Sequence, residues 1–369
     1  MHPGYYRFPT IHDNTVVFAT EGDLWQVRLN ADSKTAVRLT AGLGVAEYPR
    51  FNPDGSLIAF SGSYEGAPEV FVMSASGGEP RRLTFLGSRV LVCGWDPEGR
   101  ILFATTARTP HGRPSRIFRV SPEGGEPELV PVGQALTLSY GPSGGSVLGR
   151  YGMVSREPAH WKRYKGGTAG DLWVDREGTG EFERLITVDG NVTHPLWVGE
   201  RIYFAADHEG IGNLYSCTPE GSDLTRHTNH TDYYVRHPST DGTRIVYHAG
   251  ADLYVFDPES ESAKQIEVEY PGPRAERHRK FVPAAPYLEQ YSLHPAGHLM
   301  TAVVRGKPVV MGPFEGPTIQ LGAPQGVRYR MMDWLEDGSL VMTSDEDTEV
   351  RMERHPAPAA FTPPPGGEA

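Results

Sequence analysis

One five-residue segment carries the residue types of a nucleophile site. Residues 141–145 read Gly-Pro-Ser-Gly-Gly and match the Gly-x-Ser-x-Gly elbow of serine hydrolases. That elbow needs a strand before the serine and a helix after it. The residues that follow, Val147-Leu148-Gly149, are typical of a strand instead. We therefore expect Ser143 to lie in a β-turn, and we predict no catalytic residue in this chain.

A second group carries side chains that bind metals. His227, His230, Asp232 and His237 have spacings that zinc tolerates, and zinc favours such nitrogen and oxygen ligands. Successive residues of a strand point to opposite faces, so these side chains are not expected to converge. The sequence also lacks a His-Glu-x-x-His motif, a Cys-x-x-Cys pair and a phosphate-binding loop. We predict neither a metal nor a cofactor.

A loop rich in aromatic and basic residues is the first candidate binding site. Residues 156–168 include His160, Trp161, Lys162 and Tyr164. Such a set can hold an extended peptide through cation–π contacts and pairing with carboxylates. The alternative is a loop that packs its tryptophan onto its own sheet.

Two adjacent tyrosines are a second candidate. Tyr233 and Tyr234 stand at the entry to a predicted strand, and the innermost strand of a ring of sheets can direct alternate side chains into a central channel. Packing between blades is the equal alternative for both rings.

The elements that must position these residues form a sequence repeat. An apolar entry, a Pro-Asp-Gly-type turn and an apolar strand recur, and most intervals match the roughly 40 to 45 residues of a four-stranded propeller blade. The turn glycines stand at Gly55, Gly99, Gly144, Gly199, Gly242, Gly297 and Gly338. Counting a degenerate first copy at 11–14, we expect six blades to close a ring between Tyr5 and Val268.

The repeats divide the chain into three parts. Residues 1–270 hold the six-bladed β-propeller, and residues 271–286 are a Pro-rich, basic linker. Residues 287–369 contain about two more blades, too few to close a second ring. The predicted fold is therefore all-β, a six-bladed propeller followed by an incomplete second propeller, and we expect the chain to be part of a longer protein.

Composition limits the partners and the location. The net charge of −11 argues against a nucleic-acid partner, because nucleic-acid binding needs a basic surface. There is no basic, apolar secretory signal and no run of about 20 apolar residues, so we predict no membrane contact. The two cysteines, Cys93 and Cys217, suit a reducing compartment. These features together predict a cytoplasmic protein.

The motifs taken together resemble the N-terminal part of the tricorn protease family of cytosolic peptidases. The specific matches are Pro-Ala-His-Trp-Lys-x-Tyr-x-Gly-Gly-Thr at 158–168, Arg-Ile-Tyr-Phe at 201–204, Asp-Leu-Thr-x-His-Thr at 223–228 and Thr-Asp-Tyr-Tyr at 231–234. The resemblance implies a six-bladed propeller, then the first blades of a seven-bladed one. It also implies that PDZ-like and serine peptidase domains follow beyond this chain, and that six subunits assemble.

The resemblance adds one site residue and a function. The family has a paired-arginine element near the third blade that anchors the substrate C-terminus, and only Arg89 matches it here. The predicted function is a non-catalytic region that provides a peptide channel, gating and self-assembly, in a parent that is a serine peptidase. The alternatives are a stand-alone TolB-like protein-binding propeller and the cap of a prolyl-oligopeptidase-type enzyme. The missing export signal and the unfinished second propeller argue against these two.

Overall fold

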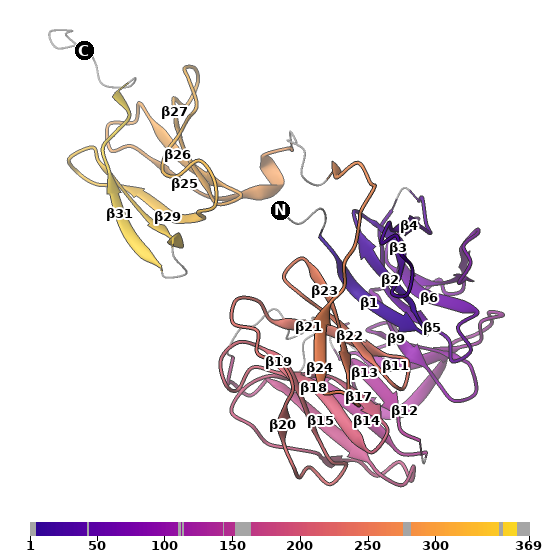
Figure 1. Cartoon of the computed structure of the whole chain (residues 1–369). Helices are drawn as coiled ribbons and strands as arrows, with labels where there is room; N and C mark the ends of the chain where they lie inside the picture. The colour runs from indigo at the N-terminus through magenta and orange to yellow at the C-terminus, as the bar shows by residue number, and fades with distance from the viewer. Residues whose placement is uncertain are drawn as a thin grey trace, which may run out of the picture. The chain divides into compact units, whose positions relative to one another are not determined.

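The structure is a computed structural model that describes residues 5–42, 44–109, 112, 114–142, 144–151, 164–275, 282–346 and 350–359. These residues contain no α-helix, and the chain divides into two compact units, residues 1–277 and 278–369 (Figure 1). No helix within these ranges is long and apolar enough to cross a membrane. The all-β fold predicted from the repeats is confirmed. The predicted domain boundaries stay predictions.

The first unit consists of six four-stranded antiparallel sheets, each formed by consecutive strands. Their strands, in chain order, are β1–β4 (Arg7–His12, Thr15–Thr20, Asp23–Arg28, Val37–Arg38), β5–β8 (Ala46–Phe51, Leu57–Gly62, Glu69–Ser74, Arg81–Arg82), β9–β12 (Val90–Trp95, Ile101–Thr105, Arg116–Val120, Glu128–Gln134), β13–β16 (Thr137–Tyr140, Ser146–Tyr151, Gly170–Asp175, Glu183–Arg184), β17–β20 (Val192–Val198, Arg201–Ala206, Asn213–Cys217, Thr225–Arg226) and β21–β24 (Val235–Thr240, Ile245–Ala249, Asp252–Asp257, Ser262–Gln265).

The recurring turn joins the first two strands of a sheet. Between β5 and β6, the Gly55 amide donates to the Asn52 carbonyl at 3.0 Å, and the Ser56 amide donates to the Asp54 carboxylate at 2.8 Å. Gly55 has φ +74°, a conformation that side chains with a Cβ rarely adopt. In this turn, the aspartate accepts a backbone hydrogen bond and the glycine adopts the positive φ, as the sequence predicts.

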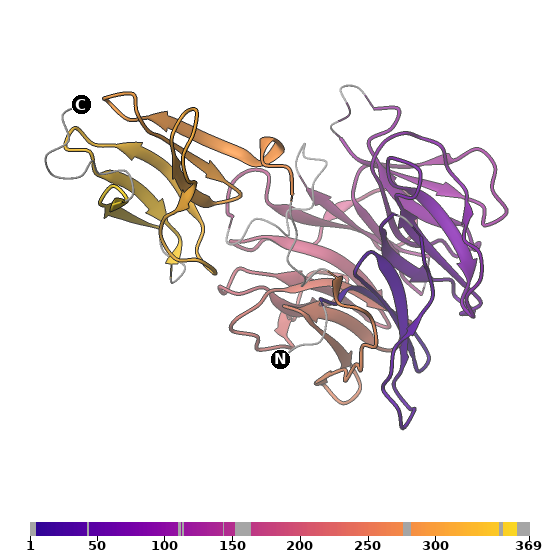
Figure 2. The same ribbon diagram turned by 90° about the horizontal axis from the view of Figure 1, so that it is seen from above.

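The sheets close into a ring because both faces of each are apolar. Val16 and Phe18 of the first sheet pack in one buried cluster with Val246 and Leu253 of the sixth. The main chain also joins these two sheets, since the Tyr6 amide donates to the Ala251 carbonyl at 3.3 Å. The indigo first sheet lies beside the orange sixth sheet (Figures 1 and 2). Separate clusters bury the other neighbouring faces.

The second unit holds two sheets. The first contains β25–β28 (Leu288–Leu293, Met300–Val304, Lys307–Met311, Ile319–Gln320), preceded by the 3-10 helix Ala285–Tyr287, and the second contains β29–β31 (Tyr329–Trp334, Leu340–Ser344, Arg351–His355). The two sheets share a core that includes Val303, Val310 and Met342. The other face of the first sheet exposes apolar side chains, with Tyr291 65% and Leu293 59% exposed.

Candidate functional site

A cavity of about 290 Å³ lies on the axis of the first unit, where the first strands of the six sheets end. These strands are β1, β5, β9, β13, β17 and β21, and each contributes residues to the lining. Because the six sheets are far apart in sequence, only ring closure brings these residues together. Small ligands commonly bind in concave sites such as the mouths of β-barrels, and this cavity is concave and lined by every sheet of the ring.

Aromatic side chains form much of the wall and are held in place. The Trp95 indole N–H donates to the Arg50 carbonyl at 3.0 Å. The Trp197 ring lies over Gly141, where a Cβ would come within 2.5 Å of it, so only glycine fits there. Phe51 and Tyr140 complete the aromatic lining. The two tryptophan rings are therefore held in place by contacts within the chain itself.

Two charged groups line the cavity. The Arg50 guanidinium donates to the Pro49 carbonyl at 2.8 Å, which holds it against the inner strands. Burial alone would raise the pKa of Asp241, but hydrogen bonds from Arg244 and Thr243 outweigh it, so the pKa is lowered and the carboxylate stays charged. The Cys93 thiol also lines the cavity, but burial raises its pKa to about 12, which leaves it without nucleophilic thiolate.

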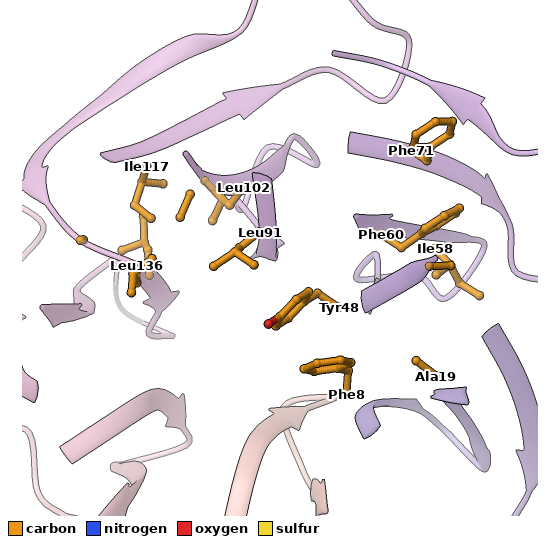
Figure 3. Packing of buried hydrophobic residues seen from close by; sticks show 14 of the residues in the cluster. Phe8, Ala19, Tyr48, Ile58, Phe60, Phe71, Leu91, Leu102, Ile117 and Leu136 are labelled. Carbon is orange, nitrogen blue, oxygen red and sulfur yellow. The ribbon is translucent and has the colours of Figure 1, made fainter. Parts of the chain in front are cut away.

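Four packed rings on the axis form the floor beneath the cavity, and of these only His194 is itself among the lining residues. The rings of Phe8 and Tyr48 have centroids 4.1 Å apart, and His237 lies 4.5 Å from Phe8 and 4.9 Å from His194. All four side chains are buried, with 5 to 7% exposed. Figure 3 shows the Tyr48 ring between the Phe8 ring and Leu91 of another sheet.

An unusual backbone directs these four rings inward. Phe8, Tyr48, His194 and His237 have φ between +48° and +55°, and each precedes a proline. At each of them the pairing register with the next strand shifts, as in a β-bulge. A non-glycine residue in this conformation costs about 1–3 kcal/mol, so the surrounding packing must hold it there.

His237 and the neighbouring His248 are neutral at pH 7. Burial lowers the pKa of His237 well below its usual value, and the neighbouring His194 and His248 lower it further. Burial also lowers the pKa of His248 to about 3. The His237 and His248 rings are stacked with centroids 5.3 Å apart. Neither His237 nor His248 therefore carries an imidazolium charge at neutral pH.

The site residues predicted from sequence lie away from this cavity, and their binding roles stay predictions. Arg89, Tyr233 and Tyr234 precede the inner strands β9 and β21, and Tyr164 lies between β14 and β15. In antiparallel sheets these positions share the end of the ring opposite to the cavity. Arg89 and Tyr233 are exposed, and the Tyr234 hydroxyl donates to the Gly210 carbonyl at 3.2 Å. His160, Trp161 and Lys162 are outside the described residues, as is Ser143.

The predicted histidine group is dispersed. The His227 Nε2 lies 2.7 Å from the Ser216 hydroxyl, His230 Nε2 lies 3.1 Å from the Tyr247 hydroxyl, and His237 is on the axis. Within the described ranges, no three His, Cys, Asp or Glu side chains are grouped as a metal site would require.

The axial rings have a sequence signal that the motifs above do not include. It is an aromatic residue followed by proline, repeated at Phe8-Pro9, Tyr48-Pro49, His194-Pro195 and His237-Pro238.

Comparison with known proteins identifies the class. The family described as the tricorn protease N-terminal beta propeller domain matches residues 3–262. The chain belongs to this family. A tricorn protease homolog of Saccharolobus solfataricus is 37% identical over 351 residues, which are 94% of this chain and 32% of that protein. Tricorn protease homolog 1 of Streptomyces coelicolor is 38% identical over 366 residues, 96% of this chain and 33% of that protein.

A solved structure agrees with these relatives. The crystal structure of the tricorn protease matches with a TM-score of 0.67 and 29% identity, over 93% of this chain and 33% of that one. The chain thus spans about a third of the length of these relatives. The predicted resemblance to tricorn protease is confirmed.

Proposed function

We propose that this chain is a non-catalytic propeller region of a tricorn-like serine peptidase, and that its axial cavity binds peptides handled by the parent enzyme. The observation that carries the proposal is the cavity that all six inner strands line with fixed aromatic walls. Membership of the tricorn family supports peptides as the ligand class. Action in the cytoplasm, self-assembly and contact with PDZ-like and peptidase domains of the parent are further parts of the proposal.

Passage of peptides along the axis, the predicted channel role, would require movement of the floor. The Phe8 and Tyr48 rings are packed against each other below the cavity. The cavity itself offers an arginine, hydroxyl groups and aromatic surface, which suit a peptide main chain and an apolar side chain.

Titration of the intact chain with a linear eight-residue peptide of Ala, Leu and Phe tests the proposal. Trp95 and Trp197 line the cavity, so occupancy should change tryptophan fluorescence. Trp197→Ala should weaken binding by about tenfold, the equivalent of roughly 1.4 kcal/mol of contact. Arg28→Gln is the control, because Arg28 is exposed and outside the cavity. Equal affinity of the Trp197→Ala and control variants would place binding elsewhere.

A further inference from the structure

One junction of the ring is crossed by no continuation of the chain. From the first sheet to the sixth, the chain passes from the last strand of one sheet to the first strand of the next, as it does between β4 and β5. After β24 it enters residues 266–275, and the next strand, β25, belongs to the second unit. In the part of the chain that the structure describes, the sixth and first sheets are therefore held together by non-covalent contacts.

Residues 266–275, here called the strap, cross this junction. The Ala36 amide donates to the Glu269 carbonyl, and the Glu269 amide donates to the Lys34 carbonyl, both at 2.8 Å. Thr35 and Glu269 thereby form a parallel β-bridge, just before β4 at the edge of the first sheet. In Figure 1 the orange segment that follows β24 runs beside the indigo first sheet. The strap thus supplies a main-chain link where chain continuity is missing.

The side chains of the strap alternate as in a β-strand. Ile266, Val268 and Tyr270 belong to the apolar cluster between the sixth and first sheets, whereas the two residues between them are exposed. The Tyr270 ring is only 4% exposed and meets the Trp25 ring edge-on, with centroids 4.8 Å apart. Aromatic pairs in this geometry contribute more than the area they bury. Tyr270 is therefore the apolar anchor of the strap.

Polar contacts hold the exposed side of the strap. The Thr35 hydroxyl donates to the Glu269 carboxylate at 2.6 Å. The Ala275 amide donates to the Glu21 carboxylate at 2.8 Å, which ties the end of the strap to the turn between β2 and β3. Exposed hydrogen bonds contribute little net stability, because water can replace either partner. The hold of the strap on the first sheet therefore depends mainly on Tyr270.

Three hydrogen bonds that cross the same junction outside the strap are long. They join the Tyr6 amide to the Ala251 carbonyl at 3.3 Å, the Ser239 hydroxyl to the Thr10 hydroxyl at 3.3 Å, and the Arg244 guanidinium to the Asn14 side chain at 3.4 Å. Arg244 also donates to the Asp13 carbonyl. Bonds near 3.4 Å are weak. The junction therefore rests mainly on its apolar cluster, to which the strap contributes three side chains.

We propose that the strap is a latch: it holds the sixth sheet to the first, and its release lets the ring open at this junction while the other five junctions stay closed. The physical reason is chain connectivity. A short connecting segment keeps two neighbouring sheets close together, so they re-form their contact at little entropic cost, whereas the sixth and first sheets have only the strap. The latch needs no ligand and is independent of the proposed function.

Labelling of buried thiols measures the opening of two junctions in one molecule. Val246→Cys places a thiol in the apolar cluster of the first and sixth sheets, where Val246 is fully buried. The native Cys217 lies in the cluster between the fourth and fifth sheets, a junction that the chain crosses from β16 to β17. Iodoacetamide is added to the intact chain at mildly alkaline pH, and mass spectrometry follows each thiol in its own peptide.

Tyr270→Ala, added to the Val246→Cys chain, removes the anchor of the strap. We expect labelling of the introduced thiol to accelerate by about tenfold or more, and labelling of Cys217 to change by less than about twofold, because only one junction opens. Phe118→Ala is the matched control. Its ring is 6% exposed and lies between the second and third sheets, which the chain joins from β8 to β9, so it should favour neither thiol.

Each outcome decides the proposal. Acceleration at the introduced thiol alone, in Tyr270→Ala alone, supports the latch. Equal acceleration at both thiols would mean that the ring opens as a whole, and no acceleration would mean that the strap holds nothing; either result overturns the proposal. So does preferential labelling of the introduced thiol in Phe118→Ala. If Tyr270→Ala prevents folding, Tyr270→Leu takes its place under the same criteria, because it keeps an apolar side chain and loses the edge-on contact with Trp25.

Discussion

The Thr84 hydroxyl donates a hydrogen bond to the buried Glu69 carboxylate at 2.6 Å, joining the end of the second sheet to the start of its third strand. The same hydroxyl oxygen accepts the Val70 amide at 2.9 Å. Thr40 with Asp23, and Thr228 with Asn213, repeat both contacts. This is why a Leu-Thr or His-Thr pair recurs at the edge of the sheets.

Removal of this hydroxyl should destabilise the ring. Thr84→Val leaves the buried Val70 amide without its partner and removes one hydrogen bond from the Glu69 carboxylate, which keeps the Gly87 amide and the Arg82 guanidinium. The expected cost is about 1–3 kcal/mol in the free energy of unfolding. Thr84→Ser keeps the hydroxyl and is the control. Urea denaturation of both variants measures the difference. Equal stabilities would show that the hydrogen bonds contribute nothing net.

The buried histidines should make the ring sensitive to acid. The pKa values of His237 and His248 are lowered in the folded protein, that of His248 to about 3, so the unfolded chain binds protons first. The contribution of these histidines to the free energy of unfolding is therefore full above pH 6.5. It is lost as the pH falls from 6.5 toward 3, by up to about 1.4 kcal/mol per pH unit for each histidine.

His248→Phe isolates this contribution, because it removes one titrating group and keeps an apolar ring. The variant should lose less stability between pH 6.5 and 4.5 than the unmodified chain, when both are followed by denaturant unfolding at each pH. If the free energy of unfolding changes with pH by the same slope in both proteins, His248 is protonated in the folded state.

The chain by itself should not cleave peptides. In the sequence, Ser143 falls in a turn slot of the repeat, and the structure joins the flanking Gly141 amide to the Gly145 carbonyl at 2.8 Å. A fluorogenic tripeptide should therefore stay intact when incubated with the purified chain, and Ser143→Ala should change nothing. Cleavage that disappears in Ser143→Ala would contradict this assignment.

The exposed sheet face of the second unit should promote self-association. Tyr291 and Leu293 lie on one face with Met300 and Ala302, their partners on the next strand. Exposed apolar area is unfavourable by about 25 cal/mol per Å², and a second copy can cover it. Light scattering should show an oligomer for the intact chain and a smaller species for Leu293→Glu. Phe314→Ser, at a 99% exposed residue outside the strands, is the control. A monomer for the intact chain at micromolar concentration would refute the idea.

The repeat made the sheets predictable because its causes are local. A Pro-Asp-Gly turn closes a hairpin through contacts within five residues, as Asn52 to Ser56 do, and apolar strands bury both faces in any propeller. The family was also predictable, since the run at 158–168 is specific in sequence. The axial cavity was not predictable in this way. Arg89 and Tyr233 were chosen by type and resemblance, they lie beyond the other end of the inner strands, and their binding roles stay predictions.

The sequence by itself determined the turns, the strands and the order of the sheets, because each depends on residues that are neighbours along the chain. Only the tertiary structure decided what occupies the axis. Phe8 and His237 are separated by almost the whole ring in sequence, yet their ring centroids lie 4.5 Å apart. Ring closure alone brings them together, and the left-handed backbone before each proline then turns them inward, so no local pattern could reveal that they meet.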